Sequence, residues 1–265
     1  PQATRQKSLS TTPVSTDPPE LVLFDGKGKR VLIVEDVKLN AQILGQLLER
    51  VNLQADYAYD GLEAVSMATA HPDGYYSLIL MDIHMPRLDG FAAATELRRV
   101  HQLHTPILAV TATVVDEDTL DAYRDIYDSF IIKPFKAQTV YSRISTYFSD
   151  PAAPWKQSNI PEDPFSGKEK AIQNLGGLVD VYEKSVARFR TNYQNAGNEL
   201  EQLIQSGKLE EATRFAHSIK GLAGTLGMDP LYRCSAVIED KLRSGDYRNL
   251  IADLEQFKTL LAQVI

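Results

Sequence analysis

The chain has 265 residues, of which 43% are hydrophobic and 24% are charged, values that fit a folded globular protein and exclude a disordered or fibrous one. Its 28 Lys and Arg residues against 35 Asp and Glu residues give a formal net charge of -7, which disfavours binding to nucleic acid or to an anionic membrane surface. The single cysteine, Cys234, excludes a disulfide framework, and the five histidines form no H-x-x-x-H pair, which disfavours a helical zinc site.

The N-terminal residues 1–29 are rich in Ser, Thr, Pro and Gln and show no hydrophobic period, so we expect a disordered linker. They contain no apolar core of a signal peptide, and no stretch of the chain approaches the ~20 apolar residues that span a bilayer. The chain starts without Met, so we interpret it as a piece of a longer protein. The expected location is the cytoplasm, and a parent protein anchored in the inner membrane remains an open alternative.

From Arg30 to Phe148, short apolar runs alternate with amphipathic stretches. Runs of strand character lie at 31–34, 55–59, 77–81, 106–110 and 129–132. Stretches of helical character lie between and after them, at about 38–51, 61–70, 90–101, 116–124 and 136–148. Continuous apolar strands separated by helices indicate βαβ units around a buried parallel sheet. The sequence therefore predicts a doubly wound, five-stranded α/β domain over residues 30–148.

Polar residues follow several of these strands. Glu35 and Asp36 end the first strand, Asp82 ends the third, Thr111 ends the fourth, and the fifth runs into Lys133. The carboxyl ends of parallel strands meet at one edge of a doubly wound sheet, so these side chains should converge there. Clustered carboxylates suit Mg²⁺, which prefers hard oxygen ligands. With the charge neutralised, Asp82 becomes the logical nucleophile towards a phosphoryl group, while Lys133 and Thr111 bind the phosphoryl oxygens.

A nucleotide or flavin site is disfavoured in this domain. Such sites bind phosphate through backbone N–H groups of a Gly-rich or Ser/Thr-rich loop after the first strand. Here that turn carries two acidic residues, and the Gly26-x-Gly28 pair lies before the strand.

Residues 30–148 resemble the receiver domain of bacterial response regulators and hybrid histidine kinases. The resemblance rests on VLIVED (31–36), LILMDIHMPRLDG (78–90), ILAVTA (107–112) and FIIKPF (130–135). It implies a flavodoxin-like fold, with Asp82 as phosphoacceptor and Lys133 as phosphoryl clamp before a cis Pro134. It further implies a metal site and a pair of switch residues. The implied metal-binding residues are Glu35, Asp36, Asp82 and the backbone carbonyl of His84; the implied switch residues are Thr111 and Phe130.

One segment departs from the family pattern. The family usually has a small Ala-Gly pair before the fifth strand, whereas this chain reads Tyr123-Arg124-Asp125-Ile126-Tyr127. The departure does not touch the acidic residues, so it leaves the expected chemistry in place. It puts in question the conformation of the preceding helix and the partner surface beside it.

Residues 149–166 contain four prolines and predict a stiff linker between domains. After it no strand pattern remains. Helical periodicity covers about 178–206, 208–228, 231–243 and 247–264, so residues 167–265 predict an all-α bundle.

His217 lies in a helical segment whose apolar residues form one stripe. Its position, about 200° from Phe215 on a 3.6-residue helix, places it on the opposite face, together with Lys220, Gly221 and Gly224. A glycine inside a helix costs roughly 0.5–1 kcal/mol relative to alanine. Either the two glycines allow another protein surface to approach the imidazole, or they serve close helix packing. In the first case Lys220 would steady an incoming phosphoryl group.

This helix resembles the H-x-x-K-G signature of histidine-containing phosphotransfer (Hpt) domains, here His217-Ser218-Ile219-Lys220-Gly221. The similarity covers about 168–265 and includes LGM (226–228) and Ile238-Glu239 in the following helix. The resemblance implies that His217 is a second phosphoacceptor and that Gly221 and Gly224 form a docking face. The sequence has no P-loop or other nucleotide-binding loop, so the resemblance implies phosphotransfer chemistry without an ATP-binding kinase core in this chain.

Together the two resemblances imply the C-terminal part of a bacterial hybrid sensor histidine kinase. Asp82 would accept a phosphoryl group from a kinase phosphohistidine and pass it to His217, which would donate it to a downstream response regulator. The implied cofactor is Mg²⁺, with no nucleotide, flavin or zinc, and the implied partners are a kinase core and a receiver domain, without nucleic acid or membrane contact. Two alternatives stay open: a free-standing receiver–Hpt adaptor or phosphate sink, and a scaffold that acts without phosphorylation.

Overall fold

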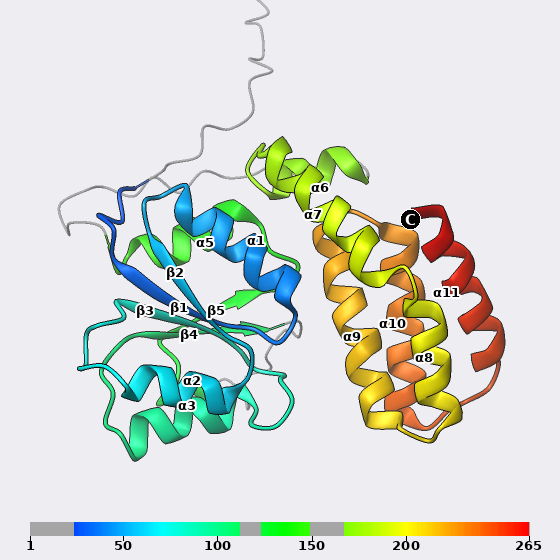
Figure 1. Cartoon of the computed structure of the whole chain (residues 1–265), viewed down its shortest axis with the longest axis horizontal. Helices are drawn as coiled ribbons and strands as arrows, with labels where there is room; N and C mark the ends of the chain where they lie inside the picture. Colours follow the sequence, from blue (N-terminus) through cyan, green and yellow to red (C-terminus); the bar gives the residue numbers. More distant parts are fainter. Residues whose placement is uncertain (1–23, 112–122, 149–166, 265) are drawn as a thin grey trace, which may run out of the picture.

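The structure, a computed structural model, describes residues 24–111, 123–148 and 167–264 (Figure 1). It shows an α/β domain beside a helical bundle. Three expectations lie largely or wholly outside these residues: most of the N-terminal linker, almost all of the helix at 116–124, and the linker at 149–166. The linker was expected to end at residue 29. Phe24 already stacks on Phe148 (ring centroids 5.8 Å apart), and the Gly26 N–H donates to the Val51 carbonyl (2.6 Å).

The described strands form one parallel sheet in the order β2-β1-β3-β4-β5. Their bounds are β1 Arg30–Val34, β2 Gln54–Ala58, β3 Leu78–Asp82, β4 Ile107–Thr111 and β5 Ser129–Ile132. β3 and β4 are buried along their whole length because helices cover both faces, which explains their continuous apolar sequences. The predicted doubly wound, flavodoxin-like fold is confirmed. Since β1 lies between β2 and β3, the order of strands reverses beside β1, where such folds bind ligands.

Alternate residues of the strands point into two cores. Val31 and Ile33 face the core under α1 and α5, whereas Leu32 and Val34 face the core under α2 and α3. The helices of this domain are α1 Lys38–Glu49, α2 Gly61–Thr69, α3 Gly90–Arg99 and α5 Ala137–Ser145. Because both faces of the sheet are packed in a core, the carboxyl ends of the strands have fixed positions, and so do the first residues of the loops that follow them.

The C-terminal part is all-α, as predicted. Its helices are α6 Lys168–Asn174, α7 Val179–Tyr193, α8 Ala196–Gln205, α9 Leu209–Thr225, α10 Asp229–Ser244 and α11 Leu250–Val264. The sequence pattern predicted one helical stretch at 178–206, but the structure divides it into α7 and α8 at Gln194 and Asn195, and it adds the short α6. Neither residue at the break is Gly or Pro, so the pattern contained no strong signal for it.

Candidate functional site

Three carboxylates meet at the carboxyl edge of the sheet. Glu35 and Asp36 follow β1, and Asp82 ends the neighbouring β3. Carboxylate oxygens of the three residues lie within 4.8 Å of one another. Glu35 and Asp82 are buried, while Asp36 is half-buried. The convergence predicted from the strand ends is therefore present.

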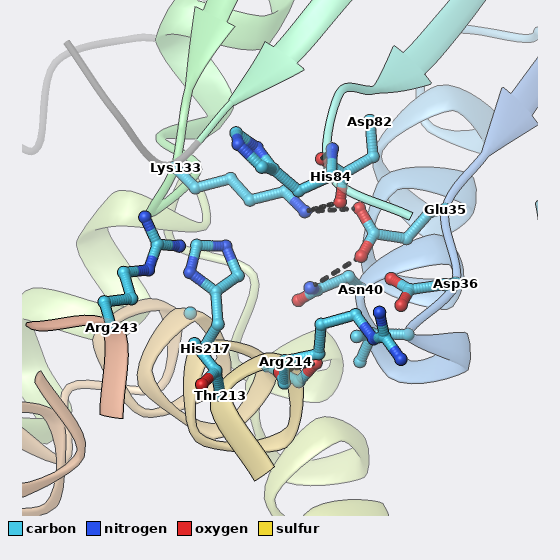
Figure 2. Close-up of a pocket in the computed structure, with 13 residues that line it drawn as sticks. Glu35, Asp36, Asn40, Asp82, His84, Lys133, Thr213, Arg214, His217 and Arg243 are labelled. Carbon is cyan, nitrogen blue, oxygen red and sulfur yellow. Dashed lines mark hydrogen bonds and ion pairs between the residues drawn. The ribbon is translucent and has the colours of Figure 1, made fainter. Parts of the chain in front are cut away.

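Lys133 connects two of these acids. Its ammonium group donates to Asp82 Oδ2 and to Glu35 Oε2, both at 2.6 Å (Figure 2). The other oxygen of Glu35 accepts from the Asn40 amide (2.9 Å), and Asp82 Oδ1 accepts from the backbone N–H of His84 (3.1 Å). The peptide bond between Lys133 and Pro134 is cis, as the family resemblance implied. Both oxygens of Asp82 are thus held in a fixed orientation.

The local electrostatics favour binding of a cation. Burial, followed by the charges of Asp82 and Asp36, raises the pKa of Glu35 to about 8 although Lys133 opposes the change. Burial and the charge of Asp82 raise the pKa of Asp36 to about 6. Lys133 alone therefore does not neutralise the three acids. Hard oxygen donors with excess negative charge are the donor set that suits Mg²⁺, so the residues fit this ion.

Thr111 and Phe130 lie next to this edge of the sheet. Thr111 is buried at the end of β4, and its carbonyl accepts from the Lys133 N–H (2.7 Å). Phe130 on β5 is half-buried, and its ring packs near Tyr127 (centroids 5.9 Å apart) and Tyr123 (6.3 Å). The unusual segment before β5 therefore supplies an aromatic cluster around Phe130. The role of Thr111 and Phe130 as a switch pair stays a prediction.

His217 on α9 is held by a buried carboxylate on α10. Its Nδ1 lies 2.8 Å from Glu239 Oε1, and Glu239 also pairs with Lys220 (2.5 Å) and Arg243 (2.7 Å). Burial disfavours the charge of Glu239, but the hydrogen bonds and charges of His217 and Lys220 outweigh burial and lower its pKa to about 2. An ionised Glu239 can only accept, so the neutral imidazole carries its proton on Nδ1 and leaves the Nε2 lone pair free.

The low pKa of Glu239 predicts an acid-sensitive contribution to stability. Its folded pKa of about 2 lies below the ordinary 4.5, so this contribution is complete above pH 4.5 and is lost as the pH falls towards 2. Glu239→Gln should lower the free energy of unfolding by about 2 kcal/mol at pH 7, and by much less at pH 3. Urea unfolding of variant and parent at both pH values measures the difference. Glu255→Gln, an exposed acid on α11, is the matched control and should change stability by under about 1 kcal/mol at either pH.

Figure 2 shows that the two halves of the molecule share one pocket. The ring of His217 lies opposite the acids and beside the exposed ring of His84, with centroids 5.8 Å apart. Gly221 also lines the pocket and has no heavy atom near the position of a Cβ. A Cβ on Gly224 would lie 3.1 Å from the Tyr232 ring, which is tight, but 3.5 Å from Pro134, which is an ordinary contact, so this glycine serves the packing of α9 against α10. The lining residues are Glu35, Asp36, Val37, Asn40, Asp82, His84, Lys133, Thr213, Arg214, His217, Ser218, Gly221 and Arg243.

Both parts of the chain match known protein families. Residues 31–145 match the response regulator receiver domain, and residues 184–265 match the Hpt domain. The chain contains a receiver domain followed by an Hpt domain. Autoinducer 2 sensor kinase/phosphatase LuxQ of Vibrio parahaemolyticus is 38% identical over 120 residues, covering 45% of this chain and 13% of the relative. Histidine kinase 3 of Arabidopsis thaliana is 27% identical over 176 residues, covering 57% of this chain and 17% of the relative.

The receiver domain of the Francisella response regulator 1452 is a solved structure similar to this chain. It is 26% identical, with a TM-score of 0.41, and the match covers 45% of this chain and 96% of that one. By contrast, the chain spans less than a fifth of the length of the two kinases named above. Among the described residues, no helix is both long and apolar enough to cross a membrane.

Three charged residues of the Hpt domain were not identified as site residues from the sequence. Arg214 and Arg243 line the pocket, and Glu239 holds His217. Glu239 could have been detected, because it lies four residues after Ser235 and eight after Leu231, within the buried stripe of α10. A carboxylate in such a stripe requires a partner. The two arginines are ordinary surface residues in the sequence and carry no comparable signal. Lys220, which was predicted to be a site residue, is paired with Glu239 and does not line the pocket.

Proposed function

We propose that the receiver and Hpt domains form a phosphorelay module. In this relay Asp82 accepts a phosphoryl group and passes it to His217, which donates it onward. The observation that carries the proposal is the shared pocket, in which the Asp82 carboxylate, the Lys133 ammonium and the His217 imidazole line the same space. A scaffold that acts without phosphorylation would need neither the buried Lys133 nor the three acids.

On the receiver side, an Asp82 oxygen attacks the phosphorus of the donor phosphohistidine, and the bond between phosphorus and the donor nitrogen breaks as the bond to Asp82 forms. Lys133 and the His84 N–H hold the carboxylate in place, and the ammonium group offsets charge on the transferred group. Glu35, Asp36, Asp82 and the His84 carbonyl would hold Mg²⁺, which supplies additional charge neutralisation when bound. The Thr111 hydroxyl would bind a phosphoryl oxygen and move inward, and Phe130 would then rotate towards the space that it leaves.

On the Hpt side, Nε2 of His217 is the nucleophile. The bond between phosphorus and the Asp82 oxygen breaks as the bond to Nε2 forms, and Asp82 returns to a free carboxylate. The imidazole becomes a phosphorylated imidazolium that keeps its Nδ1 proton, so charge and atoms balance. Glu239 stabilises this cation through the contact at 2.8 Å. Arg243, at the edge of the pocket, adds positive charge where the phosphoryl group arrives.

The proposed donor is the phosphohistidine of a histidine kinase core, and the proposed acceptor is a receiver domain of a response regulator. Kinases are among the relatives, which supports a hybrid kinase as the parent protein. We place the domain boundaries at residues 30–148 and 167–265. Because a kinase core that uses ATP would supply the phosphoryl group, we place the module in the cytoplasm.

Incubation with a phosphorylated kinase core and Mg²⁺ tests the proposal. Label should appear on Asp82 as an acyl phosphate, which is labile to base, and on His217 as a phosphoramidate, which is labile to acid. Asp82→Asn should abolish both labels, whereas His217→Gln should leave the acyl phosphate and block delivery to a response regulator. Absence of label on the parent chain would favour the scaffold. An acyl phosphate that only hydrolyses would favour the phosphate sink.

Gly221 supplies a further prediction. Gly221→Leu should leave the helix as stable as before, or more stable by up to ~1 kcal/mol, because leucine is the better helix former. The new side chain would nevertheless fill the pocket beside His217, so transfer from Asp82 should slow by about tenfold or more. Rapid-quench transfer rates and thermal melting measure the two effects. Gly221→Ala is the matched control and should slow transfer less; equal rates for leucine and parent would contradict the docking role.

A further inference from the structure

The receiver and the Hpt domain of the same chain meet with their reactive groups facing each other. His217 projects from α9 into the pocket that holds Asp82 and Lys133, beside the ring of His84. Gly224 on α9 lies beside Pro134, since a Cβ at this glycine would be in van der Waals contact with the proline ring (3.5 Å). No second chain is needed to complete this pocket, because both of its walls come from one polypeptide.

A second contact lies away from the chemistry, between α1 and α7. The Arg50 guanidinium binds both carboxylate oxygens of Asp180 (2.9 and 3.0 Å), and Arg188 donates to the Gln42 side chain (2.7 Å). The start of α7 thus meets the end of α1, so the two helices run antiparallel along the contact. Residues 42 and 46 on α1, with residue 50 directly after the helix, face residues 180, 184 and 188 on α7, and both sets repeat every four residues.

This polar contact fixes orientation more than it adds stability. Exposed ion pairs contribute little to folding, but matched charges select one arrangement of two surfaces over others. Two separate contacts, one at the pocket and one along α1 and α7, determine how the bundle lies on the sheet domain. Residues 149–166 join the domains covalently, which gives each Hpt domain a high effective concentration at its own receiver.

We propose that transfer between Asp82 and His217 occurs within one chain, in a complex of its own two domains that the contact between α1 and α7 orients. The inference rests on the proposed relay and adds the identity of the partner to it. An intramolecular step has a rate that does not depend on protein concentration, whereas transfer between chains becomes slower on dilution.

The first experiment separates the two routes. The parent chain is labelled at Asp82 with radioactive acetyl phosphate and Mg²⁺, and arrival of label at His217 is followed over about a hundredfold range of dilution. The same assay is run on an equimolar mixture of the Asp82→Asn and His217→Gln chains, which can transfer only between molecules. We expect a constant rate for the parent and a slower, concentration-dependent rate for the mixture. A parent rate that falls with dilution, or a mixture as fast as the parent, would overturn the inference while leaving the relay intact. Label that reaches Asp82 but never His217, in either sample, would instead refute the relay.

The second experiment tests the orienting contact by exchanging its charges. Arg50→Glu and Asp180→Arg should each slow transfer within the chain by about threefold to tenfold, because each places like charges opposite each other. The double variant restores an opposite-charge pair and should recover the parent rate.

Phosphorylation of Asp82 is the internal control, since neither residue lies in the pocket. Glu255→Arg, on α11 at the far side of the bundle from the receiver, is the matched control and should leave the rate unchanged. Parent rates in both single variants, or a double variant no faster than the singles, would contradict the orienting role.

Discussion

Asp36→Asn should lower the rate of phosphorylation of Asp82 by about a hundredfold or more while leaving the fold intact. The substitution removes one of three carboxylates that lie within 4.8 Å of one another and form the proposed metal site. Metal ions contribute several kcal/mol to such reactions, and each 1.4 kcal/mol corresponds to about a tenfold change in rate. Burial and repulsion from Asp82 raise the pKa of Asp36 to about 6, so the neutral amide should stabilise the folded domain slightly.

Labelling with acetyl phosphate as a function of Mg²⁺ concentration measures this effect, and thermal melting without metal measures stability. Asp125→Asn removes one negative charge from an exposed position and should change neither quantity. A variant of Asp36 that accepts phosphoryl groups at the parent rate would show that the acidic cluster is not the metal site.

Lys133→Met should destabilise the receiver domain by about 3–5 kcal/mol in the absence of metal, because it leaves buried carboxylates without their cation. The ammonium group of Lys133 is 2.6 Å from both Glu35 and Asp82, and all three side chains are buried. Methionine preserves most of the length and packing of lysine, so the loss of stability measures the contribution of the positive charge. Phosphorylation of Asp82 should fall at the same time.

Urea unfolding with and without Mg²⁺ tests the electrostatic origin of this loss. Added Mg²⁺ should raise the free energy of unfolding more in the variant than in the parent, since the ion would replace part of the missing positive charge. Lys136→Met, at an exposed position three residues away, is the matched control and should have little effect. If Lys133→Met were as stable as the parent, the charge of Lys133 would not be what stabilises the buried carboxylates.

The receiver site could be predicted from the sequence because its geometry follows from the topology. In a parallel sheet every strand delivers its last residue to the same edge, so the chain positions of Glu35, Asp82 and Lys133 already implied their convergence. Every predicted strand end lies within one residue of the observed end, since the strands other than the half-buried β2 are short apolar runs next to polar residues.

The environment of His217 could be predicted only in part. Helical periodicity placed it on a face with Gly221 and Gly224, but the partner of its Nδ1 comes from another helix. The register between α9 and α10 depends on side-chain packing along both helices, which a local sequence pattern does not specify. The same reason applies to Arg50 and Asp180, which are separated by 130 positions and have ordinary surface character in the sequence.

The position of the receiver against α9 has a consequence for the timing of the output. In the proposed relay, a response regulator that collects the phosphoryl group would have to reach the same imidazole that the chain's own receiver covers, so the two would compete for one surface. Only molecules whose domains have separated can bind it, and its apparent dissociation constant equals the intrinsic constant divided by the separated fraction. If about one molecule in a hundred is separated, an intrinsic constant of about 1 μM would appear as about 100 μM. Any event that loosens the contact between α1 and α7 would then expose His217 to the response regulator and, at the same time, slow the transfer that phosphorylates His217. The strength of this contact would therefore set the balance between phosphorylation of His217 and delivery of the phosphoryl group.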